Sequence, residues 1–352
     1  MKLVATAIAL ALVAQTPTPF APLPHPRGYV AMRAAAPPVI DGRLDDSVWV
    51  SAAWTEDFVD IEGGTKPAPL LRTRAKLAWD DKYLYVGAEL SEPNLWATIY
   101  QHDAVIFKDH DFEVFVDPDG DSHEYYEFEI NARGAFWDLF LPQPYREGGH
   151  AVDSFEMTGV RAAVALDGTL NDPRDTDRGW SVEIAFPWSA FSRDQRAPSV
   201  PRVGAQWRVN FSRVEWTLDV KDNAYVPRPN VPEANWVWSP QHVVDMHRPE
   251  RWGYVQFASA PAAFVPDPAW GAKQWLQAVH EAQRTYCTRT GRYAATLAEL
   301  GVAAPADHSL SAPTLAVTPS LYEATITLTQ AGQPAVVWHI RQDAKVWRDA
   351  PK

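Results

Sequence analysis

Residues 111–131 are the most informative part of the chain and read Asp111-Phe-Glu-Val-Phe-Val-Asp-Pro-Asp-Gly-Asp-Ser-His-Glu-Tyr-Tyr-Glu-Phe-Glu-Ile-Asn131. Two runs of alternating apolar and polar residues flank a turn of Asp, Pro and Gly, which predicts an antiparallel β-hairpin. One face of this hairpin is apolar, and the other carries Asp111, Glu113, Tyr125, Glu127, Glu129 and Asn131. Like charges on adjacent strands repel each other. We therefore expect arginines, a cation or a ligand rich in hydroxyl groups at this face, with a plain solvated acidic surface as the alternative.

Similar short runs continue from Val39 to about Phe257. They predict strands at residues 73–79, 82–90, 111–117, 124–131, 135–140, 160–166, 180–186, 206–216 and 252–257. Many short strands separated by Asp, Gly and Pro indicate a mainly β fold, an antiparallel β-sandwich of jelly-roll or immunoglobulin-like type. Alternation within these strands adds Glu183, Arg208 and Asn210 to the polar face. We expect the irregular residues 217–251 to form an ordered loop on the sandwich, because they contain tryptophans.

The two ends of the chain differ from this central part. Residues 1–14 resemble a secretory signal peptide, with Lys2 before an apolar run and Ala14 at its end. Residues 15–36 form a Pro- and Ala-rich linker, and the sandwich is expected over residues 37–260. Residues 261–352 predict a small α+β domain of unknown role, whose helix begins near Asp267-Pro268 and stops at Gly291.

The composition excludes several classes of function. Among 352 residues the net charge is -12 and there is a single cysteine, Cys287, so nucleic-acid binding and an internal disulfide are not expected. No later segment is long and apolar enough to span a membrane, and nothing in the sequence indicates an oligomeric state. The signal sequence predicts a secreted or periplasmic protein. Sixteen tryptophans suit a sugar-binding protein, because flat aromatic rings pack on pyranose rings.

Five motifs in order resemble the carbohydrate-binding module family 9-like domain over about residues 37–258. They are Pro38-Val-Ile-Asp-Gly-Arg-Leu-Asp-Asp-Ser-Val-Trp49, Trp79-Asp-Asp-Lys-Tyr-Leu-Tyr-Val86, the hairpin above, Gly179-Trp-Ser-Val-Glu-Ile-Ala-Phe-Pro-Trp188, and Asn235-Trp-Val-Trp-Ser-Pro240 leading to Arg251-Trp-Gly-Tyr254. The resemblance implies a β-sandwich that binds glycans, often beside or within glycoside hydrolases that break down polysaccharides, with structural calcium in some members.

The resemblance also implies site residues. In that family two aromatic rings clamp a sugar, while a carboxylate, an asparagine and an arginine hydrogen-bond its hydroxyl groups. Glu113 matches the carboxylate, and Asn235 and Trp238 match an asparagine and a clamping aromatic residue three positions apart. Phe107 stands where a second clamping tryptophan would be expected, and two arginines qualify for the remaining role. The predicted carbohydrate-binding residues are therefore Glu113, Asn235, Trp238, Trp236, Phe107, Arg133 and Arg208.

A calcium site is a further expectation. Asp117, Asp119 and Asp121 alternate around Gly120 and offer oxygens at a spacing that suits a hard cation. The run lacks the order of an EF-hand loop, and the sequence favours a plain Asp-rich turn over a structural Ca²⁺ site.

Two other functions compete with glycan binding. Glycosidases use two carboxyl groups across the scissile bond, whereas Glu127 and Glu129 lie side by side on one strand. The sequence therefore favours a non-catalytic protein, and hydrolysis of O-glycosyl compounds is the expected reaction if it is an enzyme. Related sandwiches bind haem between Met and His ligands, and the candidate ligands here are Met157, Met246, His247, His123 and His242.

Overall fold

The computed structural model describes residues 22–193 and 200–349. The predicted signal peptide lies outside the described residues. The chain divides into two compact units, one formed by His25–Asp267 and the other mainly by the residues from Pro268 onward.

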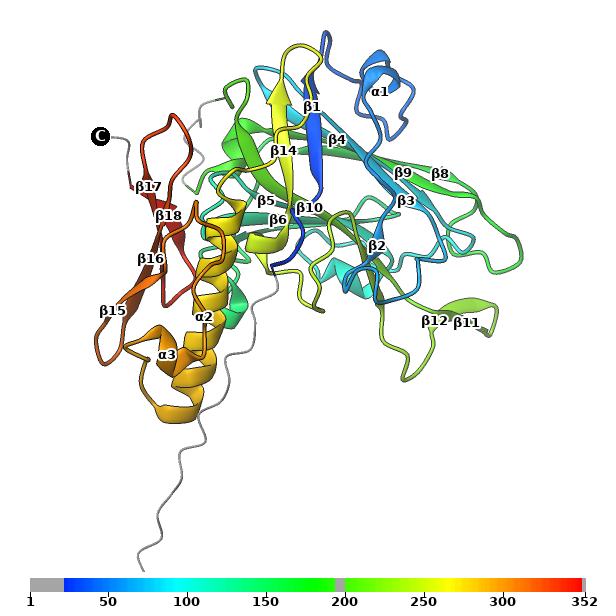
Figure 1. Cartoon of the computed structure of the whole chain (residues 1–352). Helices are drawn as coiled ribbons and strands as arrows, with labels where there is room; N and C mark the ends of the chain where they lie inside the picture. Colours follow the sequence, from blue (N-terminus) through cyan, green and yellow to red (C-terminus); the bar gives the residue numbers. More distant parts are fainter. Residues whose placement is uncertain (1–21, 194–199, 350–352) are drawn as a thin grey trace, which may run out of the picture. The chain divides into compact units, whose positions relative to one another are not determined.

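The first unit is built almost entirely from β-strands (Figure 1). In chain order they are β1 (Gly28–Arg33), β2 (Val59–Asp60), β3 (Thr73–Trp79), β4 (Tyr83–Ser91), β5 (Asp111–Asp117), β6 (Tyr125–Asn131), β7 (Phe136–Leu141), β8 (Arg161–Asp167), β9 (Gly179–Pro187), β10 (Gln206–Glu215), β11 (Leu218–Lys221), β12 (Ala224–Pro227), β13 (Ala234–Val237) and β14 (Gly253–Ala258). The one α-helix of this unit is the short α1 (Ser47–Ser51) within the described residues. The nine strands predicted from alternation are confirmed, each to within about one residue.

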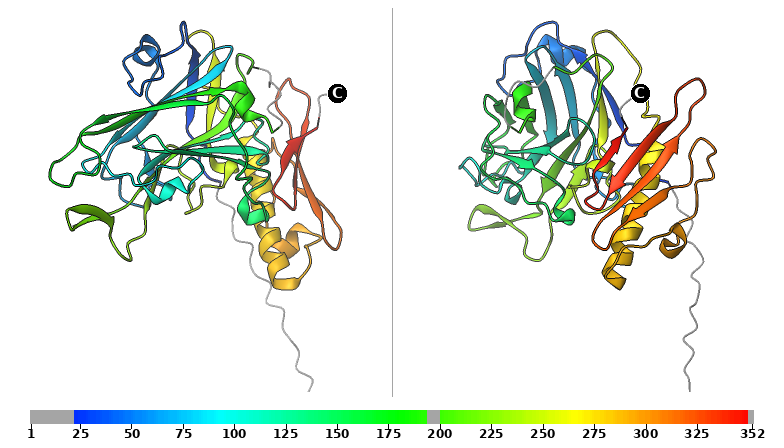
Figure 2. Two further views of the ribbon diagram at one scale, coloured as in Figure 1. Left: turned by 180° about the vertical axis from the view of Figure 1, so that it is seen from behind. Right: turned by 90° about the vertical axis from the view of Figure 1, so that its left-hand side faces the viewer.

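One sheet runs in the order β7-β6-β5-β10-β14-β1-β3-β4-β9-β8 and curls so that its two ends face each other (Figure 2). The main core lies between these ends, where Phe128 of β6 meets Phe186 of β9 with ring centroids 5.2 Å apart. This confirms the sandwich-like mainly β fold, because the apolar face of the predicted hairpin packs inward on the opposite half of the sheet.

Strand β1 corrects the prediction of a linker over residues 15–36 for its described part, and residues 15–21 lie outside the described residues. Gly28–Arg33 pairs in parallel with β14 and with β3, so the sandwich begins earlier and is not purely antiparallel. Both partners are remote in sequence, and the surrounding prolines and alanines hide the short alternating run. The sequence therefore has no local signal that would reveal this strand.

Residues 217–251 form an ordered connection, as expected. They contain the two-stranded hairpin of β11 and β12 and the strand β13, which pairs with both β10 and β2. The segment that follows β13 covers the outer side of β5 and β6, as described below.

The second unit contains α2 (Trp270–Thr290), α3 (Leu297–Leu300) and a sheet in the order β15-β16-β17-β18. Its strands are β15 (Thr314–Val317), β16 (Tyr322–Leu328), β17 (Val336–Arg341) and β18 (Val346–Arg348). Helix α2 packs on one face of this sheet and ends at Gly291, whose φ of 74° suits glycine. Thr296 and Glu299 form the capping box at the start of α3. Across residues 22–193 and 200–349, no helix reaches the length and apolarity that crossing a bilayer requires.

Candidate binding site

The acidic face of the β5–β6 hairpin is buried rather than solvated. Glu113 and Glu129 are direct cross-strand partners, and Phe115 opposes Glu127. All three glutamates, together with Asp111, are at least nine-tenths buried. This contradicts the alternative of a plain solvated acidic surface.

A second apolar cluster covers one end of this face. Trp252 lies at its centre, with ring centroids 5.5 Å from Phe115 and 5.2 Å from Tyr125. The Trp252 indole Nε1 donates a hydrogen bond of 2.8 Å to the carbonyl of Met246. The connection after β13 is thereby fixed over the sheet.

Beside this cluster lies a pocket of about 330 Å³, which we call the acidic pocket. Its aromatic walls are Phe107, Phe115, Trp137 and Tyr145. Its polar walls are Glu113, Glu127, Glu129, Glu233, Asn235, Asp245 and His247. Aromatic rings beside a few converging polar groups are typical of small-molecule sites.

The carboxyl groups of the β5–β6 hairpin at this pocket are hard to ionise, because their pKa values are raised. Burial raises the pKa of Glu113 to about 7. Burial, with the nearby charge of Glu113, raises the pKa of Glu127 to about 8. The pKa values of Asp111 and Glu129 are raised well above their usual range, again by burial first and neighbouring carboxylates second.

Few of these carboxyl oxygens have partners. Asp111 Oδ1 accepts from the Val214 backbone N–H at 3.0 Å. Glu129 Oε2 accepts from the Phe107 backbone N–H at 3.0 Å, which fixes Phe107 at the pocket. Asp111 Oδ2 and Glu127 Oε2 are buried without a hydrogen bond to any residue that the structure describes. A buried acceptor without a partner is costly, so the pocket is incomplete without a ligand or a proton.

The structure brings three predicted residues together. Glu113, Asn235 and Phe107 all line the acidic pocket, and Phe107 is 37% exposed. Phe107 comes from the loop before β5, Glu113 from β5 and Asn235 from β13.

Trp238 and Trp236 do not line this pocket. The prediction that they lie at the binding site together with Glu113 and Asn235 is therefore wrong. Both belong to the main core, and Trp238 is 0% exposed. Side chains alternate along an extended chain, so Trp236 and Trp238 face inward while Asn235 and Val237 face the opposite side. A spacing of three residues in a strand places Asn235 and Trp238 on different faces.

The two candidate arginines also lie elsewhere. Arg133 stacks on Tyr100, with its guanidinium carbon 4.0 Å from the ring centroid. Arg208 is buried with its guanidinium carbon 4.1 Å from the Tyr254 ring centroid, and it does not line the pocket.

Three other polar residues predicted on this face have structural partners. Glu183 of β9, near the other end of the sheet, accepts hydrogen bonds from the Trp49 indole and from the Asp41 and Gly42 backbone. Asn210 makes two hydrogen bonds of 2.9 Å with the Ser239 backbone. Asn131 donates to Ile99 and Asp109. These groups hold loops in place and are not available to a ligand.

Three aromatic walls of the pocket, Phe115, Trp137 and Tyr145, are absent from the predicted site residues. Phe115 follows Glu113 by two positions and so lies on the same face of β5. Trp137 of β7 is the cross-strand partner of Glu129, so continuing the alternation into the next strand would have placed it on the acidic face. Tyr145 lies in a short 3₁₀ helix, and its ring contacts His247 edge-on at 4.4 Å between centroids. No sequence pattern indicates this contact.

The predicted calcium ligands meet as expected from their spacing. One oxygen from each of Asp117, Asp119 and Asp121 lies within 4.8 Å of the others. Both oxygens of Asp117 accept backbone N–H groups, from Gly120 at 2.9 Å and Ser122 at 3.0 Å. These bonds are those of an Asp-rich turn, and they leave calcium binding a prediction.

The candidate haem ligands are spread over the molecule. Met157 packs in the main core, whereas Met246 and His247 line the acidic pocket. Burial lowers the pKa of His247 to about 3, so its ring is neutral. Its Nδ1 lies 3.0 Å from the Tyr125 hydroxyl.

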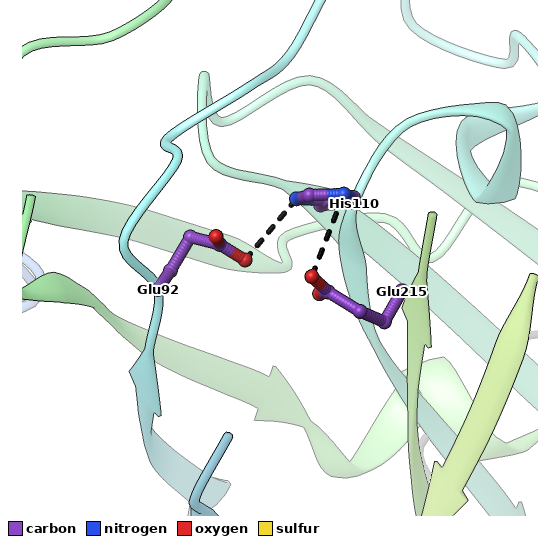
Figure 3. A group of neighbouring side chains, drawn as sticks. All are labelled: Glu92, His110 and Glu215. Carbon is purple, nitrogen blue, oxygen red and sulfur yellow. Dashed lines mark ion pairs between the residues drawn. The ribbon is translucent and has the colours of Figure 1, made fainter. Parts of the chain in front are cut away.

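A separate buried group surrounds His110 (Figure 3). His110 lies between Glu92 and Glu215, at 3.1 Å and 3.7 Å. Arg213 donates to both glutamates, at 2.6 Å and 2.8 Å. Burial alone would lower the pKa of His110, but the charges of Glu215 and Glu92 raise it overall. Arg213 and His110 thus lie against the same two carboxylates, which makes this group an internally paired network rather than an open site.

A second pocket, of about 630 Å³, lies between β4, β9 and neighbouring loops. Three of its five charged side chains are paired, Arg178 with Asp167 and Glu89 with Arg74, which lies outside the lining. The acidic pocket is the stronger candidate for a ligand, because Glu127 in its wall has a buried oxygen without a hydrogen bond among the described residues.

Comparison with known proteins agrees with this fold. Residues 40–211 match the model of the Carbohydrate family 9 binding domain-like family. A 169-residue region is 32% identical to exoglucanase XynX of Acetivibrio thermocellus, covering 46% of this chain and 13% of that enzyme. A 160-residue region is 31% identical to endo-1,4-beta-xylanase A of Thermoanaerobacterium saccharolyticum, covering 44% of this chain and 11% of that enzyme. The chain thus spans a small part of the length of these curated relatives.

Similar solved structures include a putative carbohydrate-binding protein from Bacteroides uniformis, with a TM-score of 0.48, 18% identity, and coverage of 66% of this chain and 99% of that one. Another is a carbohydrate binding module family 9 from Caldicellulosiruptor kristjanssonii in complex with cellotriose, with a TM-score of 0.41, 16% identity, and coverage of 68% and 99%. From the family match, residues 40–211 of this chain belong to the Carbohydrate family 9 binding domain-like family.

Proposed function

We propose that the β unit is a non-catalytic module that binds a saccharide in the acidic pocket. The observation that carries this proposal is the convergence of Phe107, Glu113 and Asn235 on one pocket with aromatic walls. Aromatic faces suit the C–H faces of a sugar ring, and carboxylate and amide groups suit its hydroxyl groups.

The dimensions of the pocket favour a short ligand. Its volume of about 330 Å³ lies at the lower end of the range of about 300–1,000 Å³ for small-molecule sites. We infer recognition of a single sugar unit rather than of a long chain segment. Affinity for one unit should be modest, because few atoms contribute to binding.

The arrangement of the carboxyl groups favours binding over hydrolysis. Asp111, Glu113 and Glu129 lie on one sheet face, with oxygens within 4.8 Å of one another. Retaining glycosidases hold their two carboxyl groups about 5–5.5 Å apart across the scissile bond, and inverting enzymes hold them farther apart. Side-by-side acids on adjacent strands do not flank a substrate in this way.

We further propose that the protein is exported and acts in polysaccharide breakdown or uptake. Support comes from the signal-like start of the sequence and from the partial match to an exoglucanase and an endo-xylanase. The activities of those enzymes belong to their whole chains, of which the match covers 13% and 11%.

A glycan array followed by calorimetric titration of the full chain tests the proposal. Glu113→Gln should weaken binding of the retained saccharide about tenfold or more, because a hydrogen bond to a charged group contributes about 1.5–3 kcal/mol. The matched control is Glu124→Gln, whose side chain is 58% exposed in the turn before β6. Absence of any retained saccharide, or equal binding by both variants, would reject the proposed site.

A further inference from the structure

The acidic pocket carries a strong excess of negative groups. Five carboxyl groups line it, from Glu113, Glu127, Glu129, Glu233 and Asp245, and Asp111 lies beside Glu113 and Glu129. Among the described residues that form its walls, none is lysine or arginine. The neutral His247 is the one basic side chain of these walls, and its Nε2 stays 4.0 Å from Glu127.

One carboxylate near the pocket, Glu250, has a buried side chain that is paired with arginine. Glu250 lies close to the pocket in sequence and interacts with Arg146 at 3.1 Å and Arg248 at 2.7 Å. Burial would raise the pKa of Glu250, but these arginines and Arg251 lower it to about 2. Three arginines thus surround Glu250, although its Oε2 is also buried without a hydrogen bond among the described residues, whereas neither arginine nor lysine forms the described walls of the acidic pocket.

Unsatisfied oxygens mark where a cation would lie. Glu127 is 4% exposed and lines the pocket, and its Oε2 has no hydrogen-bond partner among the described residues. Asp111 Oδ2 is likewise buried without one, and one oxygen each of Asp111, Glu113 and Glu129 lies within 4.8 Å of the other two. An ammonium group carries three N–H donors and can serve several such oxygens at once.

Resting on the saccharide-binding function proposed above, we propose that the acidic pocket selects an amino sugar whose amine is free and protonated. The ammonium group would lie against the carboxylates of the β5–β6 hairpin. The sugar ring would lie against Phe107, Trp137 and Tyr145, where aromatic faces also attract a cation. N-acetylation removes the charge, and a uronic acid would bring a like charge to the carboxylates.

The pocket favours an organic cation over a bare metal ion. A metal ion would occupy a small fraction of about 330 Å³ and would leave the aromatic walls without contact. An amino sugar fills the pocket and uses both kinds of wall. Calcium binding is therefore an outcome that the experiment must distinguish.

The test is calorimetric titration of the full chain in chelator-containing buffer near neutral pH. The probes are oligosaccharides of glucosamine, their fully N-acetylated forms, cello-oligosaccharides and an oligomer of glucuronic acid. We expect glucosamine oligomers to bind at least tenfold more tightly than the neutral probes, and the uronate oligomer to bind weakest. Glu127→Gln should remove most of this preference, measured as the ratio of the affinities for glucosamine and neutral oligomers, whereas the exposed control Glu124→Gln should keep the preference.

The outcomes separate the two proposals. Neutral probes that bind as tightly as glucosamine oligomers would overturn the amino-sugar preference and leave saccharide binding intact. A failure of every probe to bind would reject both. If the neutral oligosaccharides bind only after calcium replaces the chelator, a metal ion occupies the carboxylates. This result would also overturn the preference for glucosamine oligomers. An equal loss in Glu124→Gln would assign the preference to the net charge of the protein.

Discussion

Glu113 of β5 and Glu129 of β6 oppose each other directly across two antiparallel strands, both at least nine-tenths buried. Like charges in such a pair destabilise a sheet, and no arginine or lysine lines this part of the described structure. The pair is compatible with a stable fold when its carboxyl groups are protonated or when a ligand compensates them. The ligand-free protein and the bound protein should therefore respond differently to pH.

The free energy of unfolding of the ligand-free protein should fall as the pH rises from about 4.5 to about 8. Glu113 and Glu127 have folded-state pKa values of about 7 and about 8, above their ordinary value of 4.5. Their stabilising contribution is therefore complete below the unfolded-state pKa and is lost as the pH rises through the folded-state values. Urea unfolding at several pH values should show this decline, and Glu127→Gln should reduce it. An identical pH dependence in the variant would contradict the assignment.

Phe107→Ala should weaken saccharide binding by about three- to tenfold, because an aromatic stacking contact contributes about 0.5–1.5 kcal/mol. Stability should change little, since the ring is 37% exposed. Tyr100→Ala is the matched control, because Tyr100 is 65% exposed and does not line the acidic pocket. Calorimetric titration compares the two variants, and an equal effect would remove Phe107 from the site.

Trp238→Ala should destabilise the protein by about 3–5 kcal/mol, because it leaves a large cavity in the main core. The milder Trp238→Phe should stay folded and bind saccharide as the unaltered protein does, since Trp238 lies in the core and not on the pocket. Denaturant unfolding and calorimetric titration measure the two effects. Full stability with lost binding in Trp238→Phe would restore the stacking role that its sequence motif suggested.

Arg213→Met should cost about 3–5 kcal/mol of stability, because it leaves Glu92 and Glu215 buried without their arginine. Arg228→Met is the control, since Arg228 pairs with Asp219 at the surface and an exposed pair contributes about 1 kcal/mol or less. Urea unfolding of both variants checks the contrast. Similar small losses would show that His110 and Arg213 do not act as a network.

Calcium at the turn of residues 117–121 stays a prediction from the spacing of its three aspartates. If Ca²⁺ binds there, its addition to chelated protein should raise the melting temperature, because a ligand that binds only the folded state stabilises it. Asp121→Asn should abolish the rise, since Asp121 supplies one of the three clustered oxygens. If Ca²⁺ does not change the melting temperature of the unaltered protein, residues 117–121 form an Asp-rich turn that does not bind calcium.

Much of the fold could be read from alternation. Strands such as β5 and β9 were predicted because every second residue is apolar, and these apolar residues lie in the main core. The other face of β5 is buried as well, which alternation does not predict. Strand β1 could not be predicted, since its six residues depend on pairing with β14 and β3. The capping box at Thr296 could be predicted from the sequence, because it involves residues only three positions apart.

The residues of the candidate site could be predicted only in part from the sequence. Glu113 followed from the hairpin pattern and the family motif, and Asn235 and Phe107 followed from the motifs alone. Trp238 was misplaced although strand alternation already separates it from Asn235, which shows that local geometry should limit a motif-based assignment. The burial of the acidic face depends on the connection after β13, and no pattern in residues 238–252 specifies what they cover.

A crystal structure of the full chain with a bound saccharide tests the central claim most directly. The account predicts a sugar ring in the acidic pocket, in contact with Phe107 and hydrogen-bonded to Glu113 and Asn235. A sugar bound instead in the pocket lined by Arg43, Trp54 and Arg178, with the acidic pocket empty, would contradict it.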